Sequence, residues 1–194
     1  MHLIVYGPEG SGKGTQAGLL SGKLNVPIIT SGDLVRQEAK YDHTQEGRAC
    51  LKALKTGRYV SDEIMFKLWE KKLESQKAKQ GFILDGFPRN INQAKFLINT
   101  VSKNGYSIDK FIHIGISEGE SYRRLIKRNR KLFTGSTISH DTPRKIKSRL
   151  SVYRKNEKET VGYFKKLGLL IEIDGEKDMD EVFRSIITEI KKVS

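Results

Sequence analysis

The stretch "HLIVYGPEGSGKGTQ" at residues 2–16 decides the fold that we expect for this chain. Mostly apolar residues lead into a glycine-rich turn and a lysine, a pattern close to the phosphate-binding loop G-x-x-x-x-G-K-[ST]. Gly7, Gly12 and Lys13 match it, but the next residue is Gly14, and Thr15 stands one place late. A strand, a glycine loop and a helix N-terminus present backbone N–H groups and partial positive charge to an anion. The stretch therefore predicts a phosphate site that lacks the usual magnesium-binding hydroxyl directly after the lysine.

The composition suits one folded domain. The 194 residues are 37% hydrophobic and 30% charged, and Cys50 is the only cysteine. No apolar run approaches the roughly 20 residues of a membrane span, and no secretory signal pattern is visible at the start. We therefore expect a cytoplasmic chain, with no internal disulfide, no multi-cysteine zinc site and no membrane partner.

Positive charge is concentrated in one segment. The net charge is +13, and residues 123–166 hold 15 basic and 3 acidic residues. Polyanions are the expected partners, and both nucleic acid and nucleotide phosphates fit. A solvated helix face explains the lysines equally well. It explains the arginines less well, because the guanidinium fork suits phosphate.

Short apolar segments alternate with helical patterns along the chain. Strand patterns occupy 2–6, 26–29, 81–85, 110–116 and 169–174, and 178–193 has apolar residues at helical spacing. Continuous apolar strands suit a parallel sheet that is buried on both faces, and the alternation predicts a layered α/β sandwich with right-handed crossovers. Gly105 and Gly168 stand where helix C-caps are expected. The polar stretch 129–143 is either a surface loop or a mobile lid.

Two further stretches place charged residues beside turns. In "GFILDGFPRN" (81–90), Asp85 ends an apolar strand, as a magnesium-orienting carboxylate does, and Arg89 follows the turn. The alternative is a buried Asp that caps the next helix, although Asn90 is itself a good N-cap. In "TSGDLVR" (30–36), a helix cap explains Ser31 and the following Asp, but it does not explain Arg36.

Taken together, these stretches resemble the adenylate kinases, within the nucleoside monophosphate kinases. The matches, in family order, are "GPEGSGKGTQ", "TSGDLVRQ", "TGRYVSDEI", "LDGFPRNINQA", "RLIKR", "DTPRKIKSRLSVY" and "IDGEKDMDEV". In this family glycine regularly follows the loop lysine, so Gly14 fits. The resemblance implies a P-loop three-layer α/β sandwich with a five-stranded parallel sheet. It also implies a small insert at about 30–60 that binds the nucleoside monophosphate (NMP), and a short lid at about 128–142.

The resemblance also assigns site residues. ATP is expected to contact Gly10, Ser11, Gly12, Lys13, Gly14, Thr15, Arg124, Arg128 and Lys177. AMP is expected to contact Ser31, Arg36, Arg58, Tyr59, Val60, Gly86, Phe87, Pro88, Arg89, Gln93 and Arg149. The expected catalytic residues are Lys13, Arg89, Arg124, Arg128 and Arg149, because phosphoryl transfer needs charge neutralisation and positioning. Asp85, and as a further candidate Asp33, would reach Mg²⁺ through water, and no zinc is expected.

The implied activity is the reversible, magnesium-dependent conversion of ATP and AMP into two ADP by a monomer, without a nucleic-acid partner. The Gln93 amide can pair with the adenine edge. The pyrimidine-specific relatives tend to carry Asn there and Ala at the position of Ser31, so AMP is favoured over UMP or CMP. Two alternatives stay open: a catalytically weak nucleotide-binding or regulatory homologue, and a pyrimidine nucleoside monophosphate kinase.

Two departures from the family pattern motivate the first alternative. Glu9 stands where the family usually has proline. The family's Arg-x-Asp-Asp before the helix of Arg149 aligns with residues 138–141, "ISHD", so one lid arginine is replaced by Ile138 and an Asp by His140. Loss of one such arginine could remove several kcal/mol of transition-state stabilisation. Arg130 or Arg144 could compensate.

Overall fold

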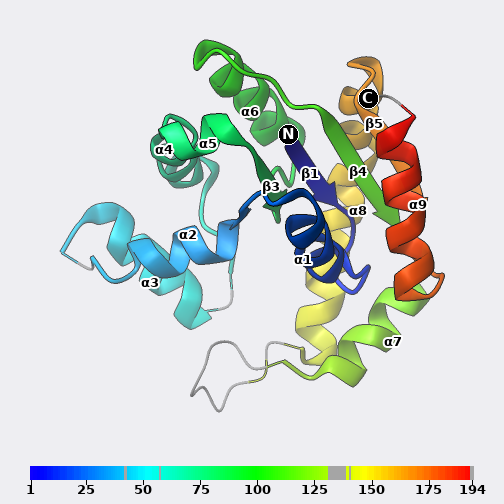
Figure 1. The fold of residues 1–194 in the computed structure, drawn as a ribbon. Coiled ribbons are helices and arrows are strands. Elements are labelled where there is room, and N and C mark those ends of the chain that lie inside the picture. Colours follow the sequence, from blue (N-terminus) through cyan, green and yellow to red (C-terminus); the bar gives the residue numbers. More distant parts are fainter. Residues whose placement is uncertain (42, 57, 131–138, 140, 193–194) are drawn as a thin grey trace.

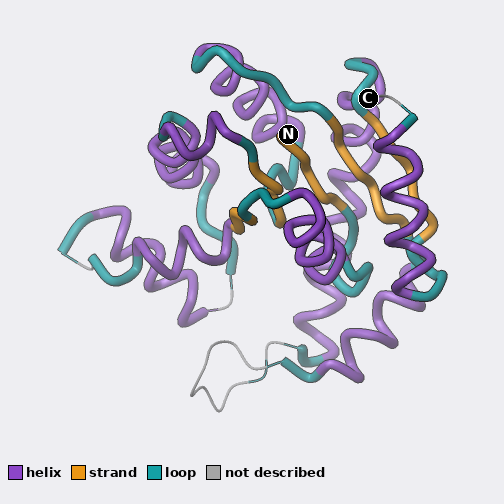
Figure 2. Tube along the Cα trace, viewed as in Figure 1, coloured by secondary structure: helices purple, strands orange, loops and turns teal. Residues whose placement is uncertain are grey.

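Five parallel strands form the centre of the computed structural model, in which residues 1–41, 43–56, 58–130, 139 and 141–192 are described. The strands are β1 (His2–Tyr6), β2 (Ile28–Thr30), β3 (Phe82–Asp85), β4 (Lys110–Gly115) and β5 (Leu170–Asp174). Their order across the sheet is β2-β3-β1-β4-β5, and each neighbouring pair is parallel. Figures 1 and 2 show the sheet between two groups of helices. The predicted α/β sandwich with a five-stranded parallel sheet is therefore confirmed.

Each strand is followed by at least one described helix, and four described helices stand between β2 and β3. The described helices are α1 (Lys13–Leu24), α2 (Ser31–Glu38), α3 (Gln45–Thr56), α4 (Asp62–Leu73), α5 (Gln76–Gln80), α6 (Ile91–Lys103), α7 (Glu118–Arg128), α8 (Pro143–Lys166) and α9 (Met179–Lys191). Gly105 and Gly168 lie just beyond the ends of α6 and α8, with φ of 81° and 70°. Glycine adopts this left-handed backbone without the steric cost of a side chain, as the sequence predicted for helix C-caps.

Both faces of the sheet are buried, because successive side chains of each strand point to opposite sides. On β1, Leu3 and Val5 join the core under α1 and α9, and Ile4 and Tyr6 join the core that also contains residues of α4, α6 and α8. Each of these four side chains is at most 5% exposed. Burial on both faces explains why the strands appear in the sequence as continuous apolar runs.

Four of the five strands differ in their bounds from the prediction. Strands β3 and β5 begin one residue later than the predicted ranges 81–85 and 169–174, β4 ends one residue before the end of 110–116, and β2 differs most. The pattern predicts a strand at 26–29, but β2 begins at Ile28. Pro27 precedes it and has no N–H group to donate to a neighbouring strand, although its carbonyl oxygen accepts from the N–H of Ile83 at 2.9 Å. The proline thus delays the strand by two residues.

The topology brings the phosphate loop beside two other strand ends. Val5 and Thr30 are both in register with Asp85, so β1, β2 and β3 end at the same edge of the sheet. From β1 the chain crosses to β2 on one side, while β4 and β5 lie on the other side. Such a reversal of strand order leaves a crevice at the carboxyl ends of the strands, where ligands bind in open α/β sheets.

Two parts of the structure bear on the predicted insert and lid. Helices α2 and α3 pack on each other and extend away from the sheet (Figure 1), and they lie in the segment predicted as the NMP-binding insert. Of the predicted lid at 128–142, residues 131–138 and 140 lie outside the described residues, and so do Ile138 and His140 of the "ISHD" stretch.

A polar cluster joins β4 to α8 behind the crevice. The Glu157 carboxylate lies 3.2 Å from His113 Nε2 and accepts hydrogen bonds from the Tyr153 hydroxyl at 2.7 Å and from Arg154 at 2.8 Å. Burial acts to raise the pKa of Glu157, but the hydrogen bonds from these three side chains outweigh it and lower that pKa to about 2.

Candidate active site

The phosphate loop connects β1 to α1. Gly12, the N-cap of α1, has a φ of 84°, which glycine adopts most readily. A side chain at Gly7 would clash, because its Cβ would lie 2.4 Å from the carbonyl oxygen of Ile114. The Lys13 ammonium donates to the carbonyl oxygen of Pro8 at 3.1 Å, and so lies over the loop. The loop thereby places backbone N–H groups, a helix N-terminus and one cation around the same space.

Gly14, the residue that departs from the general loop pattern, faces the end of β3. A Cβ at position 14 would lie 3.4 Å from Oδ2 of Asp85, within van der Waals contact. Glycine therefore leaves open the space between the loop and this carboxylate. Burial lowers the pKa of the Lys13 ammonium, and the charges of Asp85 and Glu9 oppose that shift.

The turn after β3 holds a second cation. The Arg89 Nε donates to the carbonyl oxygen of Gly86 at 2.7 Å, and its guanidinium lies 4.1 Å from the ring centroid of Tyr59. The Ser31 hydroxyl donates to the same Gly86 oxygen at 2.7 Å. These contacts fix Arg89 beside the start of α2.

Helix α2 begins at this edge and carries the predicted cation Arg36. Thr30 caps the helix by accepting from the N–H of Asp33 at 2.9 Å. Arg36 pairs with the Asp33 carboxylate at 2.6 Å, and both side chains are more than half exposed. The Arg36 hydrogen bond, followed by that of Thr30, lowers the pKa of Asp33. The cap thus accounts for Asp33, as expected, but not for Ser31, because Thr30 is the N-cap and the Ser31 hydroxyl contacts Gly86 instead. Arg36 lies along the cavity described below.

The Gln93 side chain is oriented by its neighbours and is only 5% exposed. Its oxygen accepts from the N–H of Arg89 at 2.8 Å, and its amide nitrogen donates to Asp62 at 2.6 Å. Asn90 also donates to Asp62, at 3.0 Å. Sequence reasoning did not identify Asp62 as a site residue, although it stands inside the quoted match "TGRYVSDEI". Its contact with Gln93 comes from the packing of α4 on α6.

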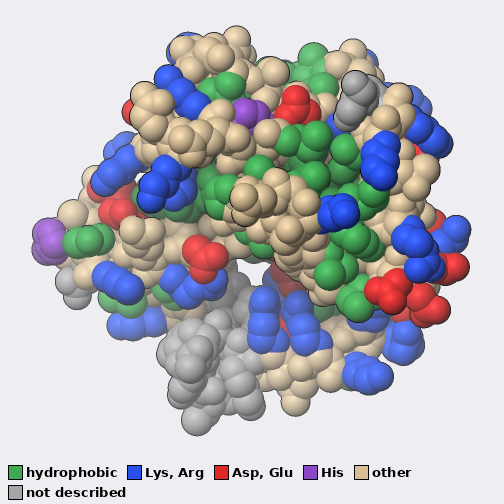
Figure 3. Space-filling view, in the orientation of Figure 1, with side chains coloured by type: hydrophobic (Ala, Val, Ile, Leu, Met, Phe, Trp, Pro, Cys, Tyr) green, Lys and Arg blue, Asp and Glu red, His purple; other side chains and the backbone are tan. Residues whose placement is uncertain are grey.

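These elements enclose one cavity of about 1140 Å³. In Figure 3 a hollow lies near the middle of the molecule, with Lys and Arg side chains along its lower rim. Among the described residues, eight cationic side chains line the cavity: Lys13, Arg36, Arg58, Arg89, Arg124, Arg128, Arg130 and Arg149. Four acidic side chains line it: Glu9, Asp33, Asp62 and Asp85. The excess of positive charge, drawn from segments far apart in the sequence, suits a ligand with several phosphates.

The arginines of α7 and α8 are held by a buried carboxylate. The Asp141 side chain is fully buried and accepts from Arg128 at 2.8 and 2.9 Å, from Arg149 at 2.8 Å and from the backbone N–H of Arg130 at 3.0 Å. Arg149 itself is 7% exposed. Arg124 pairs with Glu120 at 2.6 Å and donates to the carbonyl oxygen of Gly10 at 3.3 Å. Asp141 was named in the sequence only as an alignment position, because nothing in the pattern shows that it joins two helices.

Glu9 lies inside this group of arginines. Its Oε2 is 3.0 Å from Arg149 Nε and 3.6 Å from Arg128, and its Oε1 accepts from the Tyr59 hydroxyl at 3.3 Å. A carboxylate beside a phosphate loop is unfavourable for phosphate binding unless it points to solvent. The structure shows instead that it is paired with two of the expected catalytic arginines.

Most of the predicted site residues surround the cavity, and three do not line it. Ser11 is 3% exposed and lies behind the loop. The Phe87 ring is 1% exposed and stacks on Trp69, with ring centroids 4.6 Å apart, so its side chain belongs to the core. Lys177 lies on the exposed turn after β5, with Glu181 and Arg184. Of the two arginines considered as replacements for the missing lid arginine, Arg130 lines the cavity and Arg144 is not among its lining residues.

The carboxylates suit a metal ion only in an indirect role. Among the described residues, no three His, Cys, Asp or Glu side chains come together as a metal-binding group. Asp85 faces the cavity beside the phosphate loop without a cluster of further metal-ligating side chains among the described residues, which fits an ion held mainly by phosphate oxygens and water, as Mg²⁺ usually is.

The fold and the cavity define a class: a P-loop phosphate-binding protein of the parallel α/β type, with a second cationic site opposite the loop. The comparisons with known proteins agree and are more specific. The family model described as adenylate kinase matches residues 5–169. The chain is 34% identical over 217 residues to an adenylate kinase of Methanocella arvoryzae, with all of both chains covered. It is 33% identical over 196 residues to that of Agrobacterium fabrum, again with both chains fully covered. It is 35% identical over 191 residues to that of Thermobifida fusca, with 98% of each chain covered.

The chain belongs to the adenylate kinase family and is a nucleoside monophosphate kinase, a phosphotransferase. The resemblance stated from the sequence is thereby confirmed. In the part of the chain that the structure describes, no helix is long and apolar enough to cross a membrane.

Proposed function

We propose that the chain catalyses the reversible, magnesium-dependent transfer of a phosphoryl group from ATP to AMP, giving two ADP. One observation carries the proposal: a single cavity joins the phosphate loop to Arg89 and Arg149, so two phosphate groups can bind with their charged ends facing each other. Because the cations converge on one cavity, they favour a nucleotide over nucleic acid as the ligand. Action as a monomer and a cytoplasmic location are part of the same proposal.

On the donor side, the backbone of Gly10–Thr15 and the Lys13 ammonium would bind the phosphates of ATP. Arg124 lies against the loop through its contact with Gly10, and Arg128 lies on the same side. Both reach the cavity from α7, where the family places the arginines that cover the donor. Their fixed, always-charged guanidinium groups can neutralise charge that develops on phosphate oxygens.

On the acceptor side, Ser31, Arg36 and Arg89 would bind the phosphate of AMP, with Arg149 between the two substrates. The segments Arg58–Val60 and Gly86–Pro88 would form the wall around the acceptor. The Gln93 oxygen keeps a second lone pair, and its amide keeps a second proton, beyond the contacts that it makes with Arg89 and Asp62. These free positions match the donor and acceptor on the adenine edge and support AMP as the acceptor.

Asp85 would hold Mg²⁺ through water, in the place where Gly14 leaves space between the loop and the carboxylate. The bound ion supplies charge neutralisation at the donor phosphates. The residues of the chain itself position the two phosphates in line, pair with their oxygens and exclude the water that would otherwise hydrolyse ATP.

A screen of phosphotransfer with ATP and GTP as donors, and with AMP, UMP and CMP as acceptors, tests the proposal. We expect ADP formation from ATP and AMP, with kcat/KM for UMP and CMP at least about tenfold lower, as for the loss of one matched pair of hydrogen bonds. A preference for UMP or CMP would identify a pyrimidine kinase instead. Nucleotide binding without turnover would identify a binding or regulatory homologue.

A further inference from the structure

The Glu9 carboxylate connects three separate segments of the chain. It belongs to the phosphate loop, pairs with Arg149 of α8 and Arg128 of α7, and accepts from the Tyr59 hydroxyl after α3. Its side chain is 23% exposed and lines the cavity. The distance of 3.0 Å from Arg149 Nε is that of a direct ion pair.

Glu9 and Asp141 face the same two arginines but differ in their surroundings. The Asp141 side chain is fully buried and accepts from both guanidinium groups, so it holds them in place from behind. Glu9 meets them from the cavity side, where a phosphate would have to bind. An anion at that point leaves Arg149 and Arg128 less able to attract a second anion.

We propose that Glu9 is an internal anion that occupies the phosphate-binding arginines in the nucleotide-free chain, and that an incoming phosphate must displace it. Glu9 therefore lowers the affinity of the cavity for phosphate groups and raises the KM of the reaction. This inference rests on the proposed function for the assignment of Arg149 and Arg128 to substrate phosphates. It identifies a residue that sets substrate affinity and that does not itself act on the reacting atoms.

The proposal makes Glu9 different from a carboxylate that simply preorganises the arginines. A preorganising group would help phosphate to bind, so its removal would weaken binding. A displaced group competes with phosphate, so its removal strengthens binding. The direction of change in affinity thus separates the two roles.

The test compares wild-type protein with Glu9→Gln, which keeps the size of the side chain and its contact with Tyr59 but removes the charge. Isothermal titration calorimetry measures the dissociation constants of AMP and of inorganic tripolyphosphate at low ionic strength. We expect both constants to fall by about 3- to 30-fold, the range for removing a like charge a few ångströms from a bound anion near a protein surface. The gain in affinity of Glu9→Gln over wild type should shrink at 0.5 M salt, because salt screens the charge of Glu9 in the wild-type protein.

The matched control is Glu189→Gln on α9. Glu189 pairs with Lys192 at 2.6 Å and does not line the cavity, so this variant changes the net charge equally. Its dissociation constants should stay within about twofold of wild type. A second variant, Glu9→Ala, should show the same direction of change as Glu9→Gln if the charge, and not the shape, is responsible.

Kinetics supply a further readout. Glu9→Gln should lower the KM for AMP by a similar factor without a matching rise in kcat, because the displaced group acts on binding. Unchanged or weaker binding of both probes would overturn the proposal. Because calorimetry needs no turnover, tighter binding to Glu9→Gln in a chain that forms no ADP would uphold this inference while contradicting the proposed function.

Discussion

The contact of Asp141 with two arginines leads to a quantitative prediction. Asp141→Asn removes the negative charge of a fully buried side chain that, among the described residues, accepts four hydrogen bonds, three of them from Arg128 and Arg149. Breaking a buried ion pair costs about 3–5 kcal/mol. The Asn oxygen can still accept, and Glu9 remains beside both arginines, so we expect the free energy of unfolding to fall by about 2–3 kcal/mol. For a chain of this size, that corresponds to a melting temperature lower by roughly 4–12 °C.

The same substitution should impair turnover, because Arg128 and Arg149 lose the group that fixes their orientation. We expect kcat/KM for ADP formation to fall by roughly 10- to 100-fold, up to the cost of displacing a catalytic group by about 1 Å. Urea unfolding followed by circular dichroism measures the stability, and a coupled assay measures the turnover.

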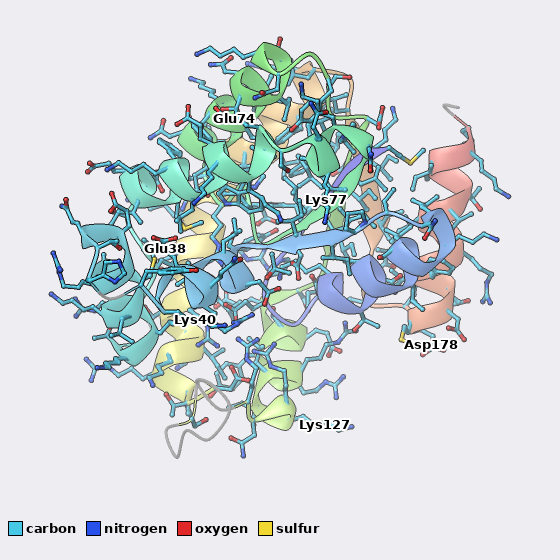
Figure 4. All side chains as sticks on the ribbon, turned by 60° about the vertical axis from the view of Figure 1, so that its left-hand side comes forward. Glu38, Lys40, Glu74, Lys77, Lys127 and Asp178 are labelled. Atoms are coloured by element: carbon cyan, nitrogen blue, oxygen red, sulfur yellow. The ribbon has the colours of Figure 1, made fainter. Side chains whose placement is uncertain are left out.

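Asp178→Asn is the matched control for this prediction. Asp178 lies at the N-terminal end of α9 on the outside of the molecule (Figure 4), and its side chain makes no capping hydrogen bond. This control should change stability by less than about 0.5 kcal/mol. If Asp141→Asn unfolds at the same urea concentration as the control, with wild-type kcat/KM, the reasoning about the buried carboxylate is wrong.

Three further predictions concern the acceptor site and the polar cluster. Arg89→Ala should reduce kcat/KM by at least about 10³-fold with little loss of stability. Lys127→Ala, the control, removes an exposed cation at the end of α7 (Figure 4) and should change kcat/KM by less than twofold. Comparable losses of kcat/KM in both variants would contradict the assignment of Arg89 to the acceptor phosphate. Asp62→Asn should raise the KM for AMP by about 5- to 20-fold, because the amide has one acceptor oxygen for the two donors, Gln93 and Asn90, that bind the carboxylate. Steady-state kinetics that show equal changes for AMP and UMP would argue against this role. Glu157→Gln should lower the free energy of unfolding by about 1–2 kcal/mol at pH 7. Urea titrations at several pH values should show this difference vanish as pH falls from 4.5 to 2, since the pKa of Glu157 is about 2 in the folded state and 4.5 ordinarily. A difference in stability that persists at pH 2 would contradict the pKa argument.

The sheet and the phosphate loop could be predicted because their signals are local. A strand buried on both faces shows as an apolar run, and the loop must have glycine where Gly7 meets a carbonyl oxygen and where Gly12 has a positive φ. Pro27 shifted one strand boundary, because backbone hydrogen bonding, and not hydropathy, decides where a strand begins.

The contacts among charged side chains could not be predicted in the same way. Asp62 and Asp141 gain their importance from helix packing that brings α4 to α6 and α7 to α8, and no spacing along the chain encodes these contacts. Glu9 was noticed only because it replaces the proline that is usual in the family, and its pairing with Arg149 depends on where α8 lies. Sequence patterns thus identified which residues carry charge, and the tertiary structure determines which charges meet.

We expect this chain to transfer phosphoryl groups between adenine nucleotides despite the carboxylate of Glu9 in its phosphate loop. The most direct measurement is ADP formation from ATP and AMP by the purified wild-type chain with Mg²⁺, followed by chromatography of the nucleotides. Two ADP should form for each ATP consumed, and removing Mg²⁺ with a chelator should stop the reaction. Binding of ATP and AMP without ADP above background would contradict this expectation.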